Sequence, residues 1–582
     1  MGNENMLNKL SRREFLGAST AAAMGAAGSM IVLPKLTSGK TTVRHLQADI
    51  VIYGGTPSGL AAATAAVGEG ASVVVVEPTS EIGGMVTGGI AVTDTTTPYL
   101  VGGLAGKFFE EAGNESRKSA TMRGSPYILF HGRKIPWNHH TPWDLEPKVA
   151  RRIFKTWVQK SGYKVLLNKK VMSARTANSR ITSIELSDGT SISGSVFIDA
   201  SYEGDLMACV GVSYTYGRES SGTYGENLAG RRLPFFTGNY SEETYRTPGW
   251  DYMHHGQFGA NIPARDSEGR FLPGVETGPY VAVGSGDKKL QAYCFRLIAT
   301  QREDLKVPWT RPERYAPERY ELLLRYIQAH PGMCFSRLIH LGSIPNGKFD
   351  LNASGPFSTD YIDGNYGYAD ADYDTRERMI RDHYDYQKGY FWFLAHDSHV
   401  PAQLREEVNS WGLCKDEWPD TGYWPVQLYI REGRRMLGEH VMTEHDVLKD
   451  KTKDDSIGMG SFVLDSHWVQ RFENSEGMVQ VEGHLDESID LKDHPYDIPY
   501  RSITPKATEC QNLLVPVCLS ASHVGYCTIR LEPVYMVLGH SAGVAASLAA
   551  KSEKPVQEIN KAQLFKKLTE QGQMLNYRQR KK

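Results

Sequence analysis

A glycine-rich run near the start of the chain has the composition of a phosphate-binding loop. It consists of Gly54, Gly55, Thr56, Pro57, Ser58 and Gly59. The run matches the dinucleotide fingerprint G-x-G-x-x-G, except that Thr56 replaces the second glycine. A helix that begins in such a loop presents free backbone N–H groups and its positive dipole end to a diphosphate. Glu77 follows Gly54 by 23 residues, where a carboxylate accepts hydrogen bonds from a ribose.

Three residues in the second half of the chain have side chains suited to proton transfer or anion binding. His523, in the run SASHVGY, carries an imidazole that titrates near neutral pH, and it is our first candidate for acid–base catalysis. The alternative is a histidine that only hydrogen-bonds the backbone or a cofactor. His467 is a second candidate, which Asp465 would orient only where the backbone bends. Arg530 could anchor an anionic group, or it could pair with Glu532.

The sequence around the glycine run predicts a scaffold for these side chains. Residues 49–53 are largely apolar and β-branched, as in a buried parallel strand. Residues 60–66 are small and begin a helix that can pack closely on a sheet. Residues 72–76 form a second buried strand, which Glu77 ends. This order is typical of a nucleotide-binding βαβ unit, and NAD and FAD sites both use it.

Thr56 is the departure from the fingerprint. Its Cβ makes close approach of the backbone to a phosphate harder than a glycine would. Its hydroxyl, in contrast, offers a hydrogen bond to a phosphate oxygen.

Three further segments distinguish FAD from NAD by their resemblance to known proteins. Gly83 and Gly84 resemble the second glycine motif of FAD-containing oxidoreductases in the glutathione-reductase-like superfamily. Residues 193–201 are similar to the strand that returns to the FAD domain there, and residues 512–550 resemble the segment that closes over the flavin ring. The resemblance implies cofactor contacts by Pro78, Gly83, Gly84, Met85, Asp199, Ala200, Ser201, Ser541 and Ala542.

The chain as a whole resembles a bacterial family of FAD-dependent oxidoreductases with a first loop of the GGTPAG type, in which the threonine is normal. Similar runs include FIDASYEGDLMACVGVSYTYGRES, residues 197–220, and DIPYRSITPK, residues 497–506. The resemblance implies FAD and an α/β fold, with a Rossmann-like, glutathione-reductase-like FAD-binding domain and an inserted α+β substrate or cap domain. Few members have a known reaction, and some are labelled xanthan-lyase-related, so it says little about the substrate.

The chain divides into five predicted segments. These are a signal segment at 1–40, the FAD-binding domain at 41–220 and 456–550, the substrate or cap domain at 221–455, and a helical tail at 551–582. Asp188-Gly189 predicts a β-hairpin. The spacing of residues 431–445 predicts a helix that returns to the FAD region. Lys348 and Asp350 alternate along an extended segment and could line the pocket.

Residues 1–40 have the pattern of an export signal. The run SRREFL, residues 11–16, fits the twin-arginine consensus. The Ala- and Gly-rich stretch that follows, residues 16–33, is barely long enough for a membrane span and only weakly apolar. We expect the twin-arginine machinery to export the folded protein with its cofactor to the periplasm, without a membrane span in the mature protein. An uncleaved anchor is the alternative.

Charge and cysteine spacing argue against several classes of partner. The formal net charge is −2 and no Lys/Arg block stands out, which argues against nucleic acid binding. None of the seven cysteines forms a C-x-x-C pair, so we expect neither a zinc site nor an iron–sulfur cluster. The wider grouping includes heterodisulfide-reductase-A-like proteins that carry such clusters, and this chain lacks the clustered cysteines.

These observations together predict an exported FAD-dependent oxidoreductase. We expect it to oxidise a small organic substrate, such as a sugar or another hydroxyl compound, by hydride transfer to a covalently or non-covalently bound flavin. The electron acceptor is unknown. Two alternatives are a flavin-bound lyase or isomerase that acts on carbohydrate without net redox, and a flavin-carrying binding protein.

Overall fold

The structure is a computed structural model. It describes residues 44–95, 97–118, 127–130, 133–136, 143–232, 260–278, 281–485, 491 and 494–577. The described residues belong to one compact unit, Arg44–Lys582. The predicted twin-arginine segment lies outside the described residues.

A seven-stranded mixed sheet carries the glycine-rich loop. Its order is β5 (Lys164–Leu166), β2 (Val73–Val76), β1 (His45–Tyr53), β8 (Ser191–Asp199), β7 (Arg180–Leu186) and β6 (Val171–Ala177), and β20 (Leu513–Leu514) also pairs with β8. The pairs of β1 with β2 and β8, of β2 with β5 and of β8 with β20 are parallel. All four valines of β2 are buried, as both faces of a parallel sheet require. The antiparallel β7–β8 pair confirms the hairpin predicted at Asp188-Gly189.

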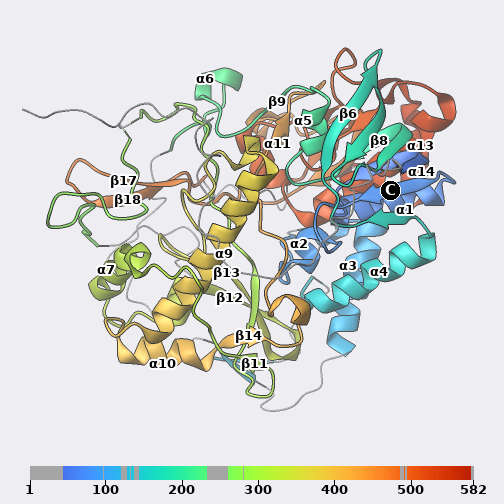
Figure 1. The fold of residues 1–582 in the computed structure, drawn as a ribbon. Helices are drawn as coiled ribbons and strands as arrows, with labels where there is room; N and C mark the ends of the chain where they lie inside the picture. Colours follow the sequence, from blue (N-terminus) through green and yellow to red (C-terminus); the bar gives the residue numbers. More distant parts are fainter. Residues whose placement is uncertain are drawn as a thin grey trace, which may run out of the picture. The chain divides into compact units, whose positions relative to one another are not determined.

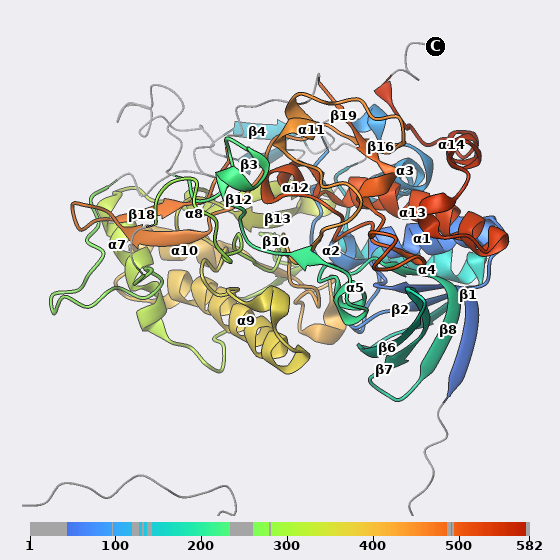
Figure 2. The same ribbon diagram turned by 90° about the horizontal axis from the view of Figure 1, so that it is seen from above.

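Two helices of small residues pack closely on this sheet. α1 (Pro57–Gly68) lies beside α13 (Glu532–Ser552), as Figures 1 and 2 show. A Cβ atom on Gly539 of α13 would overlap the backbone of Ser58 in α1, so the two backbones are nearly in contact. Bulkier residues at these positions would force the helices apart.

Two longer helices lie next to α1 and α13. α3 (Gly103–Lys118) contacts α13, and α4 (Pro147–Ser161) contacts α1. α4 buries an apolar face that includes Val149, Ile153 and Phe154. It thereby brings its N-terminal turn close to the loops that follow β1 and β2.

A second sheet, with five antiparallel strands, lies within the segment predicted as the cap domain. Its order is β11 (Lys306–Val307), β14 (Gly412–Cys414), β10 (Leu297–Thr300), β13 (Lys348–Ala353) and β12 (Ile339–Ile344). The helices α7 (Glu321–Ala329), α9 (Tyr373–His396) and α10 (Ala402–Ser410) lie on this side of the protein (Figure 1). The predicted class, an α/β Rossmann-like fold with an α+β second part, is confirmed.

The remaining elements are short. They are α2 (Gly84–Thr87), α5 (Asp205–Cys209), α6 (Ser221–Tyr224), α8 (Phe335–Leu338), α11 (Glu444–Leu448), α12 (His523–Ile529), α14 (Lys561–Glu570), β3 (Tyr127–Phe130), β4 (Arg133–Pro136), β9 (Tyr214–Thr215), β15 (Arg435–Met436), β16 (Ser456–Gly460), β17 (Gln470–Glu473), β18 (Val479–Glu482) and β19 (Tyr496–Pro499). Seven η turns of 3₁₀ type are also assigned among the described residues.

The helix predicted for residues 431–445 is wrong. This segment is extended and irregular, with the short strand β15 in its middle, and α11 begins only at Glu444. Arg431, Glu432 and Arg435 are all buried and ion-paired. Arg431 pairs with Asp360 and Arg435 pairs with Glu219, and these contacts with distant segments take the place of the predicted helix.

One helix among the described residues is long and apolar enough to cross a membrane. It is α13, and 89% of its most apolar stretch is buried inside the protein. Buried core helices meet the same criteria of length and composition.

Candidate cofactor and catalytic site

The protein's own backbone requires glycine at the two ends of the first loop. Gly54 follows β1 with φ +102°, and a Cβ atom there would lie 2.6 Å from the backbone of Ala200. A Cβ atom on Gly59 would overlap the carbonyl oxygen of Gly54. The loop is therefore folded tightly over the end of β8, and α1 begins at Pro57 with its N-terminus toward the loop.

Thr56 fixes this loop from within. Its hydroxyl accepts a hydrogen bond from the Gly59 N–H at 3.2 Å, which caps α1, and donates one to the Ala200 carbonyl at 2.7 Å. A phosphate oxygen needs a hydrogen-bond donor, and the hydroxyl hydrogen of Thr56 is already given to Ala200. The expected hydroxyl–phosphate bond is therefore corrected to a helix cap and a link to β8.

Ser58 also faces the protein and not the open side of the loop. Its Oγ atom is fully buried, has no hydrogen-bond partner and lies against Gly539 of α13. The side chains of Thr56 and Ser58 are thus used in packing. The predicted cofactor contacts of the loop can only come from its backbone.

Glu77 joins the first loop to the end of β2. Its Oε2 atom accepts a hydrogen bond from Gly55 at 2.7 Å, and its Oε1 atom accepts one from Thr79 at 2.7 Å, across Pro78. Burial raises the pKa of Glu77, and these hydrogen bonds oppose the rise. Each carboxylate oxygen can accept a second hydrogen bond, so the predicted contact with a ribose remains possible in this geometry.

The second glycine motif contacts the first loop and the start of α13. Gly83 has φ +95° and donates to the Gly55 carbonyl at 2.7 Å. Tyr202 links this motif to α13 by two hydrogen bonds. Met85 donates its N–H to the Tyr202 hydroxyl at 2.9 Å, and that hydroxyl donates to Glu532 Oε1 at 2.7 Å. A Cβ atom on Gly84 would overlap the same hydroxyl.

The acidic residue at the end of β8 stabilises the turn that follows this strand. Asp199 is fully buried and accepts hydrogen bonds from the Ser201 N–H and hydroxyl and from the Met207 N–H of α5. Burial raises its pKa to about 6. The Asp199 and Ser201 side chains therefore hold the turn in place, and Ala200 between them accepts the bond from Thr56.

Ser541 and Ala542 lie too far along α13 for the predicted contact at the helix N-terminus. The helix begins at Glu532, and nine residues of α-helix span about 14 Å. The Ser541 hydroxyl bonds the carbonyls of Ile457 and Val537, and Ala542 is fully buried. The residue that α13 presents at its N-terminus is Glu532.

His523 and Glu432 form a buried dyad. The Nδ1 atom of His523 lies 2.9 Å from Glu432 Oε2, while its Nε2 atom is buried and has no hydrogen-bond partner. Burial alone would raise the pKa of Glu432, but His523 and Arg435 lower it to about 2. The Glu432 carboxylate thus faces one side of the imidazole, and Nε2 on the other side has no hydrogen-bond partner.

A ring of charged groups holds this dyad in place. Arg435 contacts both Glu432 and Glu219, and the second oxygen of Glu219 accepts the backbone N–H of His523 at 2.9 Å. Gln291 donates to Glu432 at 2.9 Å. These groups come from four separate chain segments, and among these contacts only the Glu432–Arg435 pair, three residues apart, is local.

His467 belongs to a neighbouring buried cluster. Its Nδ1 atom lies 2.7 Å from Asp360, which also pairs with Arg431 at 2.8 Å. Asp465, the partner suggested by the sequence, is 3.9 Å from Nε2 and beyond hydrogen-bond distance. The backbone N–H of His467 donates to the side-chain oxygen of Gln291 at 3.2 Å, so Gln291 links the clusters of the two histidines.

Arg530 pairs with Asp465 and not with Glu532. Its Nη2 atom lies 2.9 Å from Asp465 Oδ2, and its Nη1 atom donates to the Tyr429 hydroxyl at 3.3 Å. The expected role as an anion anchor is weakened because Asp465 already balances its charge. The pairing between Arg530 and Glu532 that the sequence left open does not occur.

A family model for FAD dependent oxidoreductases matches residues 49–570. The chain belongs to this family. The predicted cofactor, FAD, and the predicted enzyme class, an FAD-dependent oxidoreductase, are confirmed at the level of the family. No curated protein sequence matches the chain.

Solved structures match parts of the chain. One is the OxyS anhydrotetracycline hydroxylase from Streptomyces rimosus, at 16% identity and a TM-score of 0.22, with 30% of this chain and 36% of that chain covered. Another is a flavin-containing monooxygenase from Stenotrophomonas maltophilia, at 18% identity and a TM-score of 0.19, with 31% and 43% covered. This oxidoreductase thus matches less than half the length of each.

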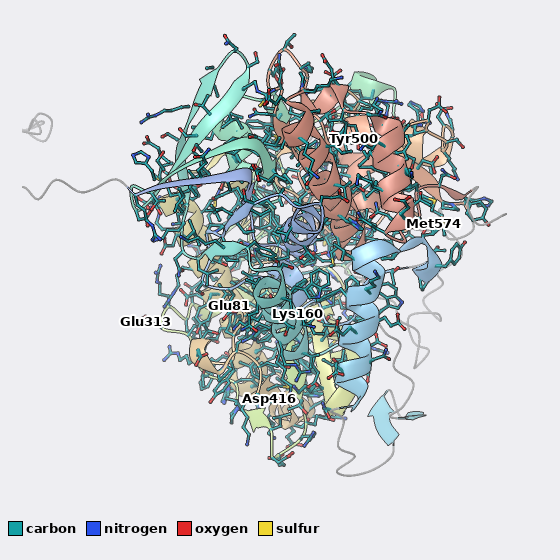
Figure 3. All side chains as sticks on the ribbon, turned by 90° about the vertical axis from the view of Figure 1, so that its right-hand side faces the viewer. Glu81, Lys160, Glu313, Asp416, Tyr500 and Met574 are labelled. Atoms are coloured by element: carbon teal, nitrogen blue, oxygen red, sulfur yellow. The ribbon has the colours of Figure 1, made fainter. Side chains whose placement is uncertain are left out.

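The residues around the glycine loops fit the diphosphate and ribose of FAD. A small cavity is lined by Thr79, Glu81, Gly84, Thr87, Gly88, Arg151, Trp418, Val426 and Gln427, of which Glu81 is labelled in Figure 3. The Nε and Nη2 atoms of Arg151 are buried there without a hydrogen-bond partner. A buried guanidinium without an acceptor is unfavourable, and an anion such as a diphosphate would satisfy it. In this oxidoreductase the backbone of Gly54–Gly59, Glu77 and Arg151 would hold FAD.

Sequence reasoning missed several residues of the site. Arg151 lies in α4, and the only signal for it is a basic residue near the N-terminus of an amphipathic helix. Glu432 is part of the run REGRR, within the segment predicted as a helix that returns to the FAD region. Gln291 and Asp360 have no sequence signal at all. They become part of the site because Gln291 bonds Glu432 and the backbone of His467, and Asp360 bonds the His467 ring.

Proposed function

We propose that this FAD-dependent oxidoreductase oxidises a hydroxyl group of a small organic substrate, such as a sugar or another alcohol, and that His523 is the base. One observation carries the proposal: His523 Nε2 is buried, has no hydrogen-bond partner and belongs to an imidazole fixed at Nδ1 by Glu432. A general base needs this combination of a fixed ring and an available lone pair.

The chemistry balances with these residues. FAD, when bound, supplies the acceptor for a hydride from the substrate carbon. The hydroxyl proton passes to His523 Nε2, and a carbon–oxygen double bond replaces the C–H and O–H bonds. Glu432 stays ionised and stabilises the imidazolium that forms. Arg435 and Gln291 keep Glu432 oriented, so the dyad changes geometry little when the proton arrives.

We also propose that the protein works outside the cytoplasm. The support is the run SRREFL and the weakly apolar stretch after it. The twin-arginine machinery would carry the folded protein with FAD inserted, and an unidentified electron acceptor would reoxidise the flavin.

Anaerobic mixing of the FAD-loaded protein with a panel of sugars and small alcohols tests the function. Bleaching of the flavin absorbance identifies a substrate. His523→Gln and Glu432→Gln should then slow bleaching about 100-fold or more, since general base catalysis contributes that much. FAD content should be unchanged. His396→Gln is the matched control, because His396 is exposed and only contacts Trp392 of its own helix.

Two outcomes would contradict the proposal. Equal bleaching rates in the wild type and in His523→Gln would remove His523 as the base. Product formed from a carbohydrate without bleaching, and without an electron acceptor, would instead support a lyase or isomerase.

A further inference from the structure

One segment next to the second sheet forms the wall of the cavity opposite the glycine loops. Lys415–Gln427, which we call the strap, leaves β14 and supplies Trp418, Val426 and Gln427 to the cavity beside Gly84 and Gly88. The indole N–H of Trp418 donates to the Thr87 carbonyl at 3.0 Å. A Cβ atom on Gly88 would lie 2.8 Å from Cβ of Gln427.

The other side of the strap faces the surface. Trp424, Pro425 and Val426 line an open groove with a volume of about 620 Å³, together with residues of α9. Val426 lines both this groove and the inner cavity. The strap is therefore a single layer of chain between the surface and the loops that bind the FAD diphosphate.

The backbone of the strap is strained. Trp418 has φ +46° and Tyr423 has φ +67°, the left-handed region that large L-residues avoid. Gly422, between them, also has a positive φ of +69°. This conformation is unfavourable for an aromatic residue, so contacts elsewhere must hold the segment in this shape.

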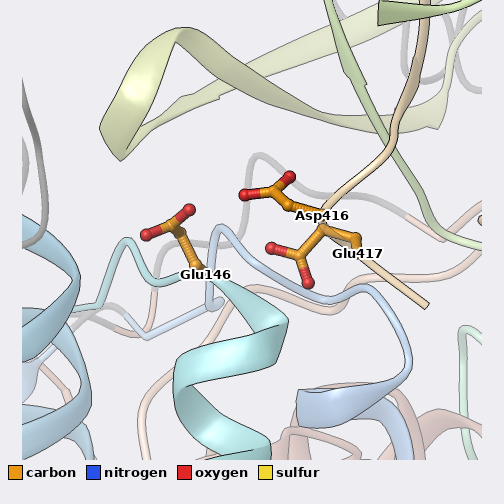
Figure 4. A group of neighbouring side chains, drawn as sticks. All are labelled: Glu146, Asp416 and Glu417. Atoms are coloured by element: carbon orange, nitrogen blue, oxygen red, sulfur yellow. The ribbon is translucent and has the colours of Figure 1, made fainter. Parts of the chain in front are cut away.

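A buried ion cluster supplies those contacts at the start of the strap. Lys348 of β13 is fully buried, and its Nζ atom lies 2.7 Å from Glu146 Oε1, 2.8 Å from Asp416 Oδ2 and 2.9 Å from Glu417 Oε1. The backbone N–H of Lys148 donates to Glu417 at 2.9 Å. Figure 4 shows Asp416 and Glu417 of the strap directed toward Glu146 at the N-terminus of α4.

The spacing of these carboxylates resembles a metal site, but a lysine fills it. Their ligand atoms all lie within 4.8 Å of one another. The Lys348 ammonium contacts all three and takes the position that a cation would need. The attraction of the carboxylates raises the pKa of Lys348 although burial opposes it, so the lysine stays charged. The cluster therefore ties the strap to α4 and β13.

We propose that the strap opens to admit FAD, closes over its diphosphate, and is held shut by the Lys348 cluster and the Trp418–Thr87 hydrogen bond. Three groups of observations point to it: the shared wall, the strained backbone and the buried ties at its base. The inference needs FAD, which the family supplies, and it is independent of the substrate proposed above.

The rate of FAD dissociation tests this inference without any substrate. Wild type and variants are loaded with FAD and diluted, and release is followed by flavin fluorescence. Lys348→Met removes the counter-charge of the buried Glu417 carboxylate, while Lys148 still pairs with Glu146 and Asp416. Trp418→Phe removes the indole N–H while it keeps an aromatic ring. Both should release FAD about 10-fold faster or more, which corresponds to about 1.4 kcal/mol. Should Lys348→Met not fold, Trp418→Phe carries the test.

Lys289→Met is the matched control. Like Lys348, Lys289 is ion-paired, with its partner Glu276 at 2.7 Å, although it is only partly buried. It lies outside the strap and the cavity. It should release FAD at the wild-type rate. Limited proteolysis adds a second measurement: FAD should slow cleavage within 415–427. Wild-type release rates in both strap variants, or equal cleavage with and without FAD, would overturn the proposal.

Discussion

Thr56 shows how one hydroxyl can support a nucleotide loop in which the sequence fingerprint lacks a glycine. Its oxygen caps α1, and its hydrogen is donated to Ala200 at the end of β8. Both bonds lie on the inner side of the loop and are buried. The substitution therefore leaves the outer backbone of the loop to the cofactor. It adds a link that glycine cannot make.

The buried acid at the start of α13 has a measurable consequence for stability. Glu532 is 5% exposed, its Oε2 atom has no hydrogen-bond partner, and burial raises its pKa from 4.5 to about 8. The folded protein thus keeps this proton to a higher pH than the unfolded chain. Its contribution to stability is complete below about pH 4.5 and is lost as the pH rises through about 8.

We therefore predict that Glu532→Gln flattens the pH dependence of the free energy of unfolding. Glutamine resembles the protonated acid but cannot ionise, so the loss between about pH 4.5 and 8, on the order of a few kcal/mol, should disappear. Urea unfolding at several pH values measures it. Glu570→Gln is the control, because Glu570 is 62% exposed on α14. Parallel curves for wild type and Glu532→Gln would contradict the prediction.

The pair of helices α1 and α13 illustrates what small residues do for an element. Gly539 and Gly543 lie one helical turn apart on the face of α13 that meets α1. Side chains there would overlap the backbone of Ser58 and Ala62. This close packing sets the position of the α1 N-terminus and of the loop before it. The pattern of small residues in both segments made the packing predictable from the sequence.

Gly539→Ala should destabilise the protein and weaken FAD binding together. The added Cβ atom meets rigid backbone, so the helices must separate, at a cost of about 1–3 kcal/mol. Thermal unfolding and a titration with FAD measure the two effects. Gly68→Ala, near the end of α1, has no atom within 4 Å of its added Cβ and should be neutral or slightly stabilising. A wild-type FAD affinity in Gly539→Ala would show that α13 does not position the loop.

For the segment 431–445, in contrast, the sequence pattern did not predict the structure. Its residues have helical spacing, which predicts a helix that returns to the FAD region. In the structure Glu432 binds His523 and Arg431 binds Asp360, both in the interior. Periodicity reports which residues share a face. It does not reveal that the charged residues form buried ion pairs with residues of distant segments.

The whole molecule brings together three chain regions around His523. Glu219 follows the first sheet, Gln291 precedes the second sheet, and Glu432 lies in the segment that returns toward α12. Because all three are buried, loss of one partner leaves a charge or an amide without its hydrogen bonds. The His523–Glu432 dyad and the fold are therefore coupled, so FAD content must be measured beside activity in each variant.

Export is a property of the whole chain and can be tested on it. Replacement of both Arg12 and Arg13 by lysine should leave the protein in the cytoplasm, with FAD bound as in the wild type, because the twin-arginine route requires the arginine pair. Cell fractionation and flavin absorbance measure location and cofactor content. An identical distribution of wild type and variant would contradict the predicted route.

The sequence by itself determined the βαβ unit, the FAD family and the three residues first considered for chemistry. Local rules suffice for these: glycines at tight turns, valine runs for buried strands, and an acid at the end of β2. Only the tertiary structure decided the partners of those residues. Glu432 for His523, Asp360 for His467 and Asp465 for Arg530 are each more than 60 residues away in the chain. Such contacts arise when sheets and loops pack, and packing between distant segments leaves no periodic trace in the sequence.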